Sequence, residues 1–229
     1  MISTRTALVT GGNGGLGTAT ISALLAAGWR VVAPVRSGTA GRLPAGAVAV
    51  EADLTVEADV RAAAATAASD PEAPLRAVVN LVGGYAGADL IADTPVADFE
   101  AMLTINLRPT YLTTAAALPY LIGAGGGSVV CVSSRAAVSP FPGAAGYVTA
   151  KAAVLAFAAA VDVEYRKQNV RCNTVLPSVI DTPANRAAMP DADHSRWVAP
   201  AAIADTIVFL ASDASAPTSG ARIPVYGQA

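Results

Sequence analysis

Short apolar runs alternate with longer alanine-rich segments along this chain, and this rhythm limits its fold more than any other feature. The runs are rich in β-branched residues and apolar throughout, which is typical of strands buried on both faces of a parallel sheet. They predict strands over Thr6–Val9, Arg30–Pro34, Ala47–Glu51, Ala77–Leu81, Ser128–Ser133, Arg171–Leu176 and Ala221–Val225. The segments between them predict helices over Gly15–Ala27, Val56–Ala68, Val96–Ile122, Tyr147–Gln168 and Pro200–Ala211. We therefore expect an α/β fold in three layers, a doubly wound parallel sheet between two layers of helices.

The composition agrees with one large hydrophobic core. A length of 229 residues predicts a single domain over residues 1–229. The hydrophobic fraction of 53% and the charged fraction of 14% argue against a disordered chain. The net charge of −2 provides no basic surface for nucleic acid or for an anionic membrane, so we expect neither partner.

The cellular location is predicted from the first residues and from the cysteines. The stretch MISTRTALVTGG leads directly into a strand and contains no secretory signal. The longest apolar run, Ala152–Val161, is too short to cross a bilayer. We therefore expect a cytoplasmic protein in which Cys131 and Cys172 are reduced and buried.

A glycine-rich turn, TGGNGGLG over Thr10–Gly17, lies between the first predicted strand and the first predicted helix. Glycines allow a tight turn there, and their missing side chains let the backbone and the helix N-terminus approach a diphosphate. Ligands of such folds bind beyond the carboxyl ends of the strands, which is where this turn lies. The turn therefore predicts a Rossmann-type dinucleotide site.

Residues at the ends of the next three strands refine this prediction. Val35 stands where an aspartate would bind the ribose of NAD, and Arg36 follows it. A guanidinium there suits a 2′-phosphate and slightly favours NADP, with a solvated loop arginine as the alternative. Asp53, followed by Leu54, is placed either to bind the adenine amino group or to cap the next helix. Asn80 ends the fourth strand, and its amide is expected to tie neighbouring strand ends together.

A serine, a tyrosine and a lysine form a second candidate site. Ser134 ends the fifth strand, Tyr147 begins the next helix, and Lys151 lies one turn further on the same face. A phenol is a poor base at neutral pH, but a nearby ammonium favours the phenolate. Ser134 is placed to hold a carbonyl or alcohol oxygen beside the phenol, and Asn106 to anchor a water that links Lys151 to solvent.

These motifs occur in the order found in a known family. TGxxxGxG, an Asn after the fourth strand, a helical Asn, Ser-x12-Tyr-x3-Lys and NTVLPSVIDTP together resemble the short-chain dehydrogenase/reductase superfamily. The resemblance extends from Thr6 to Tyr226. Each motif alone is a weak or moderate signal, and the five in order make a strong one.

The resemblance implies a role for each matching residue. Tyr147 would donate a proton in reduction and accept one in oxidation, while Lys151 would lower its pKa and bind the nicotinamide ribose. Ser134 would polarise the carbonyl, and Asn106 would complete a proton relay. The cofactor contacts would come from Thr10, Gly11, Asn13, Gly15, Leu16, Gly17, Arg36, Asp53, Leu54, Asn80, Tyr147, Lys151, Pro177, Ile180 and Thr182. The resemblance also implies a homodimer or homotetramer.

Three departures from the family pattern are visible. The usual Asn-Asn-Ala-Gly reads Asn80-Leu81-Val82-Gly83, and the usual Pro-Gly reads Pro177-Ser178. Tyr226-Gly227 replaces the common aspartate–glycine–glycine near the C-terminus, which bears on the subunit contacts or the substrate mouth. None of the three removes a catalytic group.

The loops that follow the fifth and sixth strands are expected to form the walls of the substrate pocket. They span Val138–Gly146, with Phe141 and Pro142, and Ala184–Val198. His194 is expected to be solvated and Trp197 to pack. We expect no metal site, because Asp191 and Asp193 have no further ligands beside them.

The sequence thus predicts a NAD(P)-dependent oxidoreductase, with NADP slightly favoured. It would interconvert a ketone and a secondary alcohol on a small-molecule substrate by hydride transfer. Two alternatives are a dihydropteridine-type reductase and a non-catalytic dinucleotide-binding sensor or regulator. The set of Ser134, Asn106, Tyr147 and Lys151 argues against the sensor, because a binding module needs no activated phenol.

Overall fold

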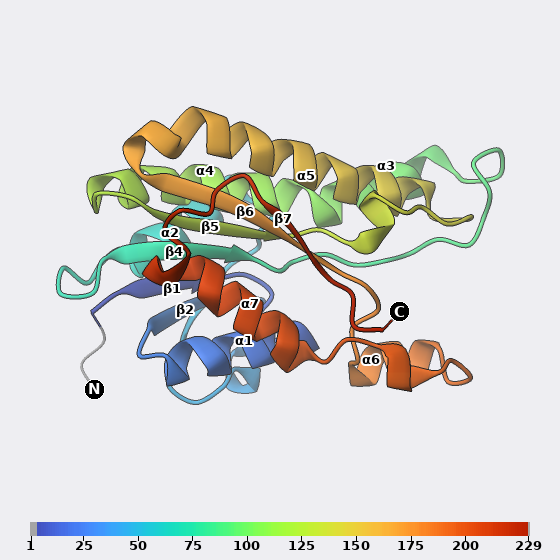
Figure 1. The fold of residues 1–229 in the computed structure, drawn as a ribbon, viewed down its shortest axis with the longest axis horizontal. Helices are drawn as coiled ribbons and strands as arrows, with labels where there is room; N and C mark the ends of the chain where they lie inside the picture. Colours follow the sequence, from blue (N-terminus) through green and yellow to red (C-terminus); the bar gives the residue numbers. More distant parts are fainter. Residues whose placement is uncertain (1–3, 229) are drawn as a thin grey trace.

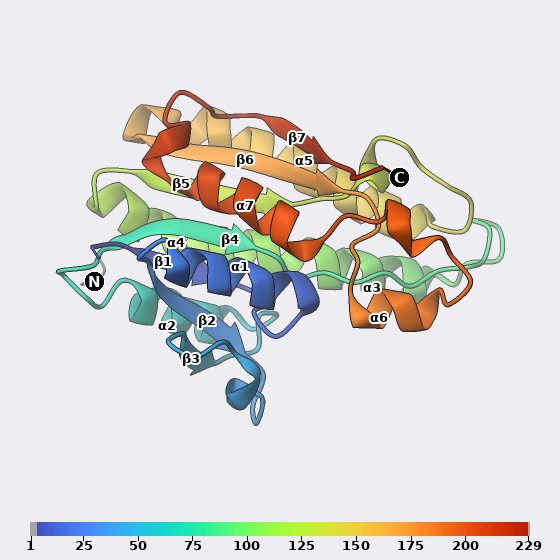
Figure 2. The ribbon, with the colours of Figure 1, turned by 60° about the horizontal axis from the view of Figure 1, so that its bottom comes forward.

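A parallel sheet lies at the centre of the computed structural model, which describes residues 4–228 (Figure 1). The strands are β1 (Thr6–Val9), β2 (Arg30–Val35), β3 (Val48–Glu51), β4 (Leu75–Asn80), β5 (Gly127–Val132), β6 (Val170–Pro177) and β7 (Arg222–Val225). All neighbours are parallel, and the order is β3-β2-β1-β4-β5-β6-β7, from one edge to the other in Figure 2. The predicted doubly wound sheet is confirmed. Residues 1–3 and 229, which belong to the predicted domain and to the N-terminal stretch, lie outside the described residues.

Helices cover both faces of this sheet. One face carries α1 (Gly15–Ala26) and α7 (Pro200–Ala211), whose Ile21, Leu24, Ile203 and Ile207 are fully buried in one core cluster. The other carries α2 (Glu57–Ala67), α4 (Arg108–Gly123) and α5 (Ala145–Tyr165), which pack around Leu121 in a second cluster. Figure 1 shows these layers, with α6 (Pro183–Ala188) beyond the carboxyl ends of the strands. The three predicted layers are present.

The prediction of one continuous helix over Val96–Ile122 is wrong. The segment forms α3 (Val96–Asn106) and then α4, with Leu107 between them at φ −101°. Pro109 has no N–H to donate to the preceding turn, and its ring disfavours a continuous helix. The break leaves Asn106 at the end of α3, fully buried, where its side chain reaches the loop after β4.

Helix α5 is the long helix of the core. Together with the turn that follows it, over Ala145–Gln168, it is the one described helix that could cross a bilayer by length and composition alone. In the fold it lies against β6 and α3, and its Val154 and Ala158 are buried in the second core cluster. It also buries the charged residues Lys151 and Asp162. Its apolar character is therefore that of a core helix.

Candidate active site

A cavity of about 780 Å³ opens beyond the carboxyl ends of the central strands. Its wall contains these predicted site residues: Gly11, Gly15, Leu16, Gly17, Ser134, Tyr147, Lys151, Pro177, Ile180 and Thr182. Thr10, Asn13, Arg36, Asp53, Leu54, Asn80 and Asn106 do not line it. The fold therefore joins the glycine turn to the serine, tyrosine and lysine in one space.

The glycine turn is too tight for side chains at several positions. Gly11 has φ +71°, and its carbonyl oxygen accepts a hydrogen bond from the Gly14 N–H at 3.0 Å. A Cβ on Gly17 would lie 2.0 Å from that same oxygen. Helix α1 begins at Gly15, and no described side chain caps it, so N–H groups of its first turn face the cavity. This cradle suits an anionic diphosphate.

Thr10 and Asn13 mainly hold loops in place around this cradle. The buried Thr10 hydroxyl accepts from the Leu81 N–H at 3.1 Å, which fixes the loop after β4. Asn13 Nδ2 donates to Thr39 Oγ1 at 2.9 Å. Its Oδ1 is buried and has no partner within residues 4–228, so Asn13 keeps one free acceptor.

Arg36 and Asp53 lie near each other on the surface, at the ends of β2 and β3. The Asp53 carboxylate accepts from the Thr55 N–H and hydroxyl, both at 2.8 Å. These bonds, and then the charge of Arg36, lower the pKa of Asp53. The alternative that Asp53 caps the next helix is wrong, because Val56 holds the N-cap position of α2 without a side-chain bond. Asp53 instead forms a turn ahead of that helix, followed by the half-buried Leu54.

Ser134 and Tyr147 bring two hydroxyl groups together in the cavity. Ser134 Oγ caps the short turn after β5, where it accepts from the Ala136 N–H at 3.1 Å. Burial raises the pKa of the half-buried Tyr147, a hydrogen bond with Ser134 opposes this rise, and Tyr85 adds to it. The phenol is therefore held protonated at neutral pH, which is the form that donates a proton.

Lys151 is buried beneath the tyrosine. Its side chain is 5% exposed, and Nζ donates to the Val132 carbonyl oxygen at 3.2 Å. Burial lowers the pKa of Lys151 to about 8, against the opposing effect of Cys131. The ammonium lies 6.0 Å from the centre of the Tyr147 ring. The predicted lowering of the tyrosine pKa is not found in the protein alone, since burial outweighs the other effects and the net shift is upward.

Asn106 lies behind the cavity wall and contacts the loop that carries Gly83 and Gly84. Its Nδ2 donates to the Gly84 carbonyl oxygen at 3.0 Å, and its Oδ1 accepts from the Gly84 N–H at 3.1 Å. A Cβ on Gly83 would lie 2.6 Å from Asn106 Oδ1 and 2.8 Å from Lys151 Nζ. Both polar groups therefore border the space that a side chain on Gly83 would fill. The water predicted to link them stays a prediction.

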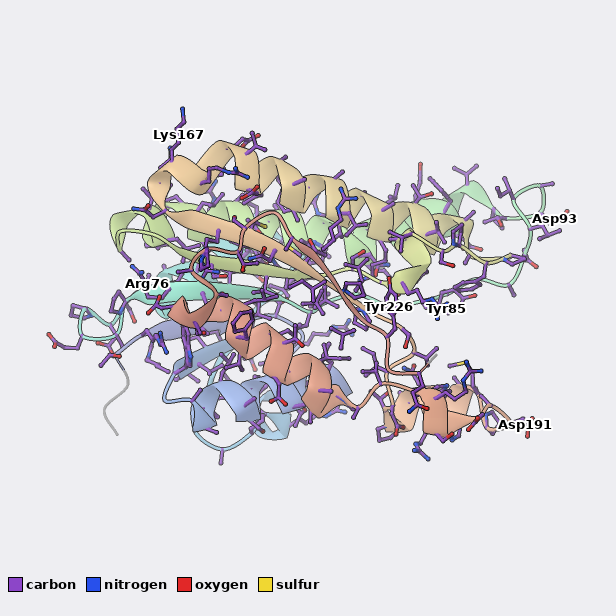
Figure 3. All side chains as sticks on the ribbon, viewed as in Figure 1. Arg76, Tyr85, Asp93, Lys167, Asp191 and Tyr226 are labelled. Carbon is purple, nitrogen blue, oxygen red and sulfur yellow. The ribbon has the colours of Figure 1, made fainter. Side chains whose placement is uncertain are left out.

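The wall residues that the sequence prediction missed include Tyr85 and Arg135. The Tyr85 ring lies 5.9 Å from that of Phe141 and 5.3 Å from that of Tyr147, and Figure 3 shows Tyr85 at this end of the molecule. An aromatic residue directly after two strand-end glycines was the available signal for Tyr85. Of the two residues expected from the loop after β5, Phe141 lines the cavity and Pro142 does not.

The remaining candidates make structural contacts. Asn80 Nδ2 donates to Thr114 Oγ1 at 3.0 Å and to Cys131 Sγ at 3.7 Å, so its amide ties β4 to α4 and β5 as predicted. Cys131 and Cys172 are free and buried. His194 is half-buried rather than merely solvated, with Nε2 2.8 Å from the Met189 carbonyl oxygen.

Two further observations concern the loop after β6. The His194 ring lies 4.3 Å from that of Trp197, in line with the packing role expected of the tryptophan. Within residues 4–228, no group of three or more His, Cys, Asp or Glu side chains lies close enough together to hold a metal ion.

Comparison with known proteins connects this geometry to a family. The sequence model described as short chain dehydrogenase matches residues 5–193. The chain belongs to the short-chain dehydrogenase family. Because the matched span contains Tyr147, Lys151 and the glycine turn, the family match and the cavity involve the same residues.

Curated and solved relatives agree with this assignment. 2-(R)-hydroxypropyl-CoM dehydrogenase of Xanthobacter autotrophicus is 31% identical over 244 residues, with 97% of this chain and 97% of the relative covered. 3-oxoacyl-(acyl-carrier-protein) reductase MabA of Mycobacterium bovis is 32% identical over 231 residues, with 97% and 92% covered. A solved short-chain type dehydrogenase/reductase from Mycobacterium ulcerans has a TM-score of 0.92 at 27% identity, with 99% and 90% covered. The family acts as oxidoreductases on hydroxyl and ketone groups.

The space at Gly83 gives a first prediction. Gly83→Ala is expected to lower kcat/KM by about 100-fold, because its Cβ would displace the Asn106 amide or the Lys151 amine. Gly84→Ala is the matched control, since its Cβ would make an ordinary contact 3.4 Å from Ile105 Cδ1. Steady-state carbonyl reduction and thermal unfolding of both variants test this. Equal losses of activity in the two variants would contradict it.

The pKa of Lys151 gives a second prediction. Since that pKa is about 8, the side chain carries its charge below this pH and loses it above. Carbonyl reduction is therefore expected to decline as the pH rises through about 8, measured as kcat/KM across the pH range. Lys151→Arg should remove this decline, because a guanidinium stays charged. If a folded Lys151→Arg variant keeps the wild-type pH profile, Lys151 is not the source of the decline in kcat/KM.

Proposed function

We propose that this protein is a NAD(P)-dependent oxidoreductase that interconverts a ketone and a secondary alcohol. The observation that carries the proposal is the meeting of the Ser134 and Tyr147 hydroxyls in a cavity that begins at the glycine turn. Two hydroxyls at one point suit a single substrate oxygen, which one of them holds while the other exchanges a proton with it.

The residues around the cavity fit a nicotinamide dinucleotide. Gly11 to Gly17 provide a cradle for its diphosphate. Thr182 packs against the glycine turn, since a Cβ on Gly15 would lie 2.7 Å from its Cγ2. Ile180 and Thr182 line the same cavity, and we propose that they contact the nicotinamide end. The cofactor, when bound, supplies or accepts the hydride.

Side chains of the protein would transfer the proton. Tyr147, with its raised pKa, would donate a proton to the carbonyl oxygen in reduction and receive it back in oxidation. Ser134 would hold that oxygen in place. Lys151 and Asn106, whose polar ends both lie beside Gly83, would carry the proton onward to solvent.

Removal of the phenol tests the proposed chemistry directly. Tyr147→Phe is expected to lower kcat for carbonyl reduction by about 100- to 10,000-fold, because the proton donor is lost. Dinucleotide binding, measured by fluorescence titration, should persist. Tyr165→Phe, at the other end of α5 and outside the cavity wall, is the matched control. Undiminished turnover in Tyr147→Phe would exclude the mechanism, and dinucleotide binding without turnover of any carbonyl by the wild type would favour a sensor.

The cofactor preference is proposed to be for NADP. Arg36 is exposed at the end of β2, and its guanidinium donates no hydrogen bond within the described residues, so it is free to bind a 2′-phosphate. Asp53 beside it is a competing partner, which limits the preference.

Arg36→Ala is expected to weaken NADPH binding by about 10-fold and to leave NADH binding unchanged. Arg42→Ala, another exposed arginine in the loop after β2, serves as the control. Titrations of the wild type, Arg36→Ala and Arg42→Ala with NADPH and NADH test this prediction. Equal affinity of the wild type for NADH and NADPH would remove this role of Arg36.

Location and assembly are further parts of the proposal. We propose a cytoplasmic homodimer or homotetramer that acts on a small carbonyl or alcohol compound. Large apolar side chains stand exposed on α4 and α5, among them Tyr111, Tyr120 and Val163, and support contact with a second copy. The structure adds no observation that favours a dihydropteridine over a ketone.

A further inference from the structure

Arg135 is a half-buried cation that has no anionic partner. Other arginines are paired, such as Arg61 with Glu57 and Arg186 with Asp181. Within residues 4–228, the arginines whose guanidinium donates no hydrogen bond are Arg36, Arg42, Arg135 and Arg222. All but Arg135 are exposed to solvent, which hydrates their charge. A guanidinium removed from part of its water and left without a counter-charge favours an anion from outside the chain.

Arg135 lines the substrate side of the cavity, and its guanidinium lies against Tyr226 at the edge of that wall. Arg135 directly follows Ser134, whereas the glycine turn forms the other part of the wall. Among the described residues, Lys151 is the one other charged residue of the wall, and its Nζ donates to the Val132 carbonyl oxygen. The neighbouring wall is largely apolar and contains Tyr85, Ala136, Pro140, Phe141, Val179 and Met189. No Asp or Glu lines it, so an anionic ligand would meet no repulsion from the described wall.

Tyr226 holds the guanidinium in position. The Arg135 Cζ atom lies 5.3 Å from the centre of the Tyr226 ring, a cation–π contact. The Tyr226 carbonyl oxygen accepts from the Ser178 hydroxyl at 2.6 Å. Gln228, two residues on, is bonded to Arg196 through its N–H at 3.2 Å and through its carbonyl oxygen at 3.0 Å. Figure 3 shows Tyr226 at the same end of the sheet as Tyr85 and opposite to Arg76.

We propose that Arg135, oriented by Tyr226, selects a substrate that carries a carboxylate in addition to the reacting ketone or alcohol. The proposal rests on the proposed function, in which Ser134 holds the reacting oxygen. Arg135 directly follows Ser134 in the same wall. A short keto acid could therefore place its ketone at Ser134 and its carboxylate at Arg135. The guanidinium matches a carboxylate with two parallel hydrogen bonds, and the apolar neighbours strengthen that attraction. A neutral substrate would leave the cation unpaired.

Paired substrates that differ only in charge provide the test. We would compare 3-oxobutanoate, 4-oxopentanoate and 5-oxohexanoate, each with its methyl ester, as substrates of the wild type. At least one acid is expected to exceed its ester in kcat/KM by about 10- to 100-fold, the effect of one charge-assisted interaction. Arg135→Met should abolish this ratio, and Arg135→Lys should retain part of it. Arg222→Met, the exposed and unpartnered arginine of β7, should keep the wild-type ratio.

Tyr226 gives an independent arm of the same test. Tyr226→Phe keeps the ring face and is expected to keep the ratio, whereas Tyr226→Ala should raise KM for the acid more than for the ester. Equal ratios in Tyr226→Ala and the wild type would overturn the positioning role of the tyrosine. The affinity for the dinucleotide is followed in every variant. A loss of that affinity in Arg135→Met would assign the arginine to the cofactor and overturn the proposal.

Calorimetric binding of the same acids and esters to the enzyme with oxidised cofactor separates this proposal from the proposed function. If the wild type binds an acid and Arg135→Met does not, the carboxylate site is supported even if no ketone is reduced. Equal binding of acids and esters, or binding of neither, would overturn it. Reduction of acids and esters at equal rates would overturn it too and leave the oxidoreductase function intact.

Discussion

Burial of the Lys151 amine is the constraint around which the site is built. An ammonium that is 5% exposed loses most of its hydration, and this loss lowers its pKa to about 8. The Val132 carbonyl oxygen restores one hydrogen bond from β5. Gly83, which has no side chain, leaves room for both this amine and the Asn106 amide. The amine on α5 thus lies where β5 and the loop after β4 meet, and Asn106 ties that loop to the end of α3.

Much of the fold could be predicted because its rules are local. Apolar strand runs and alanine-rich helices repeat along the chain, and every predicted strand is present to within two residues at each end. The error over Val96–Ile122 arose because the apolar pattern continues through the break, while Pro109 removes a backbone donor. Helix α6 was missed since its six residues are too few for periodicity, and its start depends on the bond from the Asn185 N–H to Thr182.

The candidate site was predictable where residues follow strand ends or keep a defined spacing. Ser134 and the glycine turn are of the first kind, Tyr147 and Lys151 are of the second, and they line one cavity. Arg135 and Tyr85 also follow strand ends, but their contacts with Tyr226 and Phe141 depend on which loops meet in space. The pKa of Tyr147 is a similar case: the spacing of Tyr147 and Lys151 indicated their proximity, but the burial that raises the pKa comes from the whole fold.

The bonds between Gln228 and Arg196 have a practical consequence for handling the protein. They fasten the last described residues to the loop after β6, beside the ring that holds Arg135. In Figure 1, β1 begins at the opposite end of the sheet from this segment. An affinity tag or fluorescent partner fused after Gln228 would pull on the pocket wall itself. The same fusion ahead of β1 would be attached at the end of the sheet far from the pocket and would leave the pocket in its native shape.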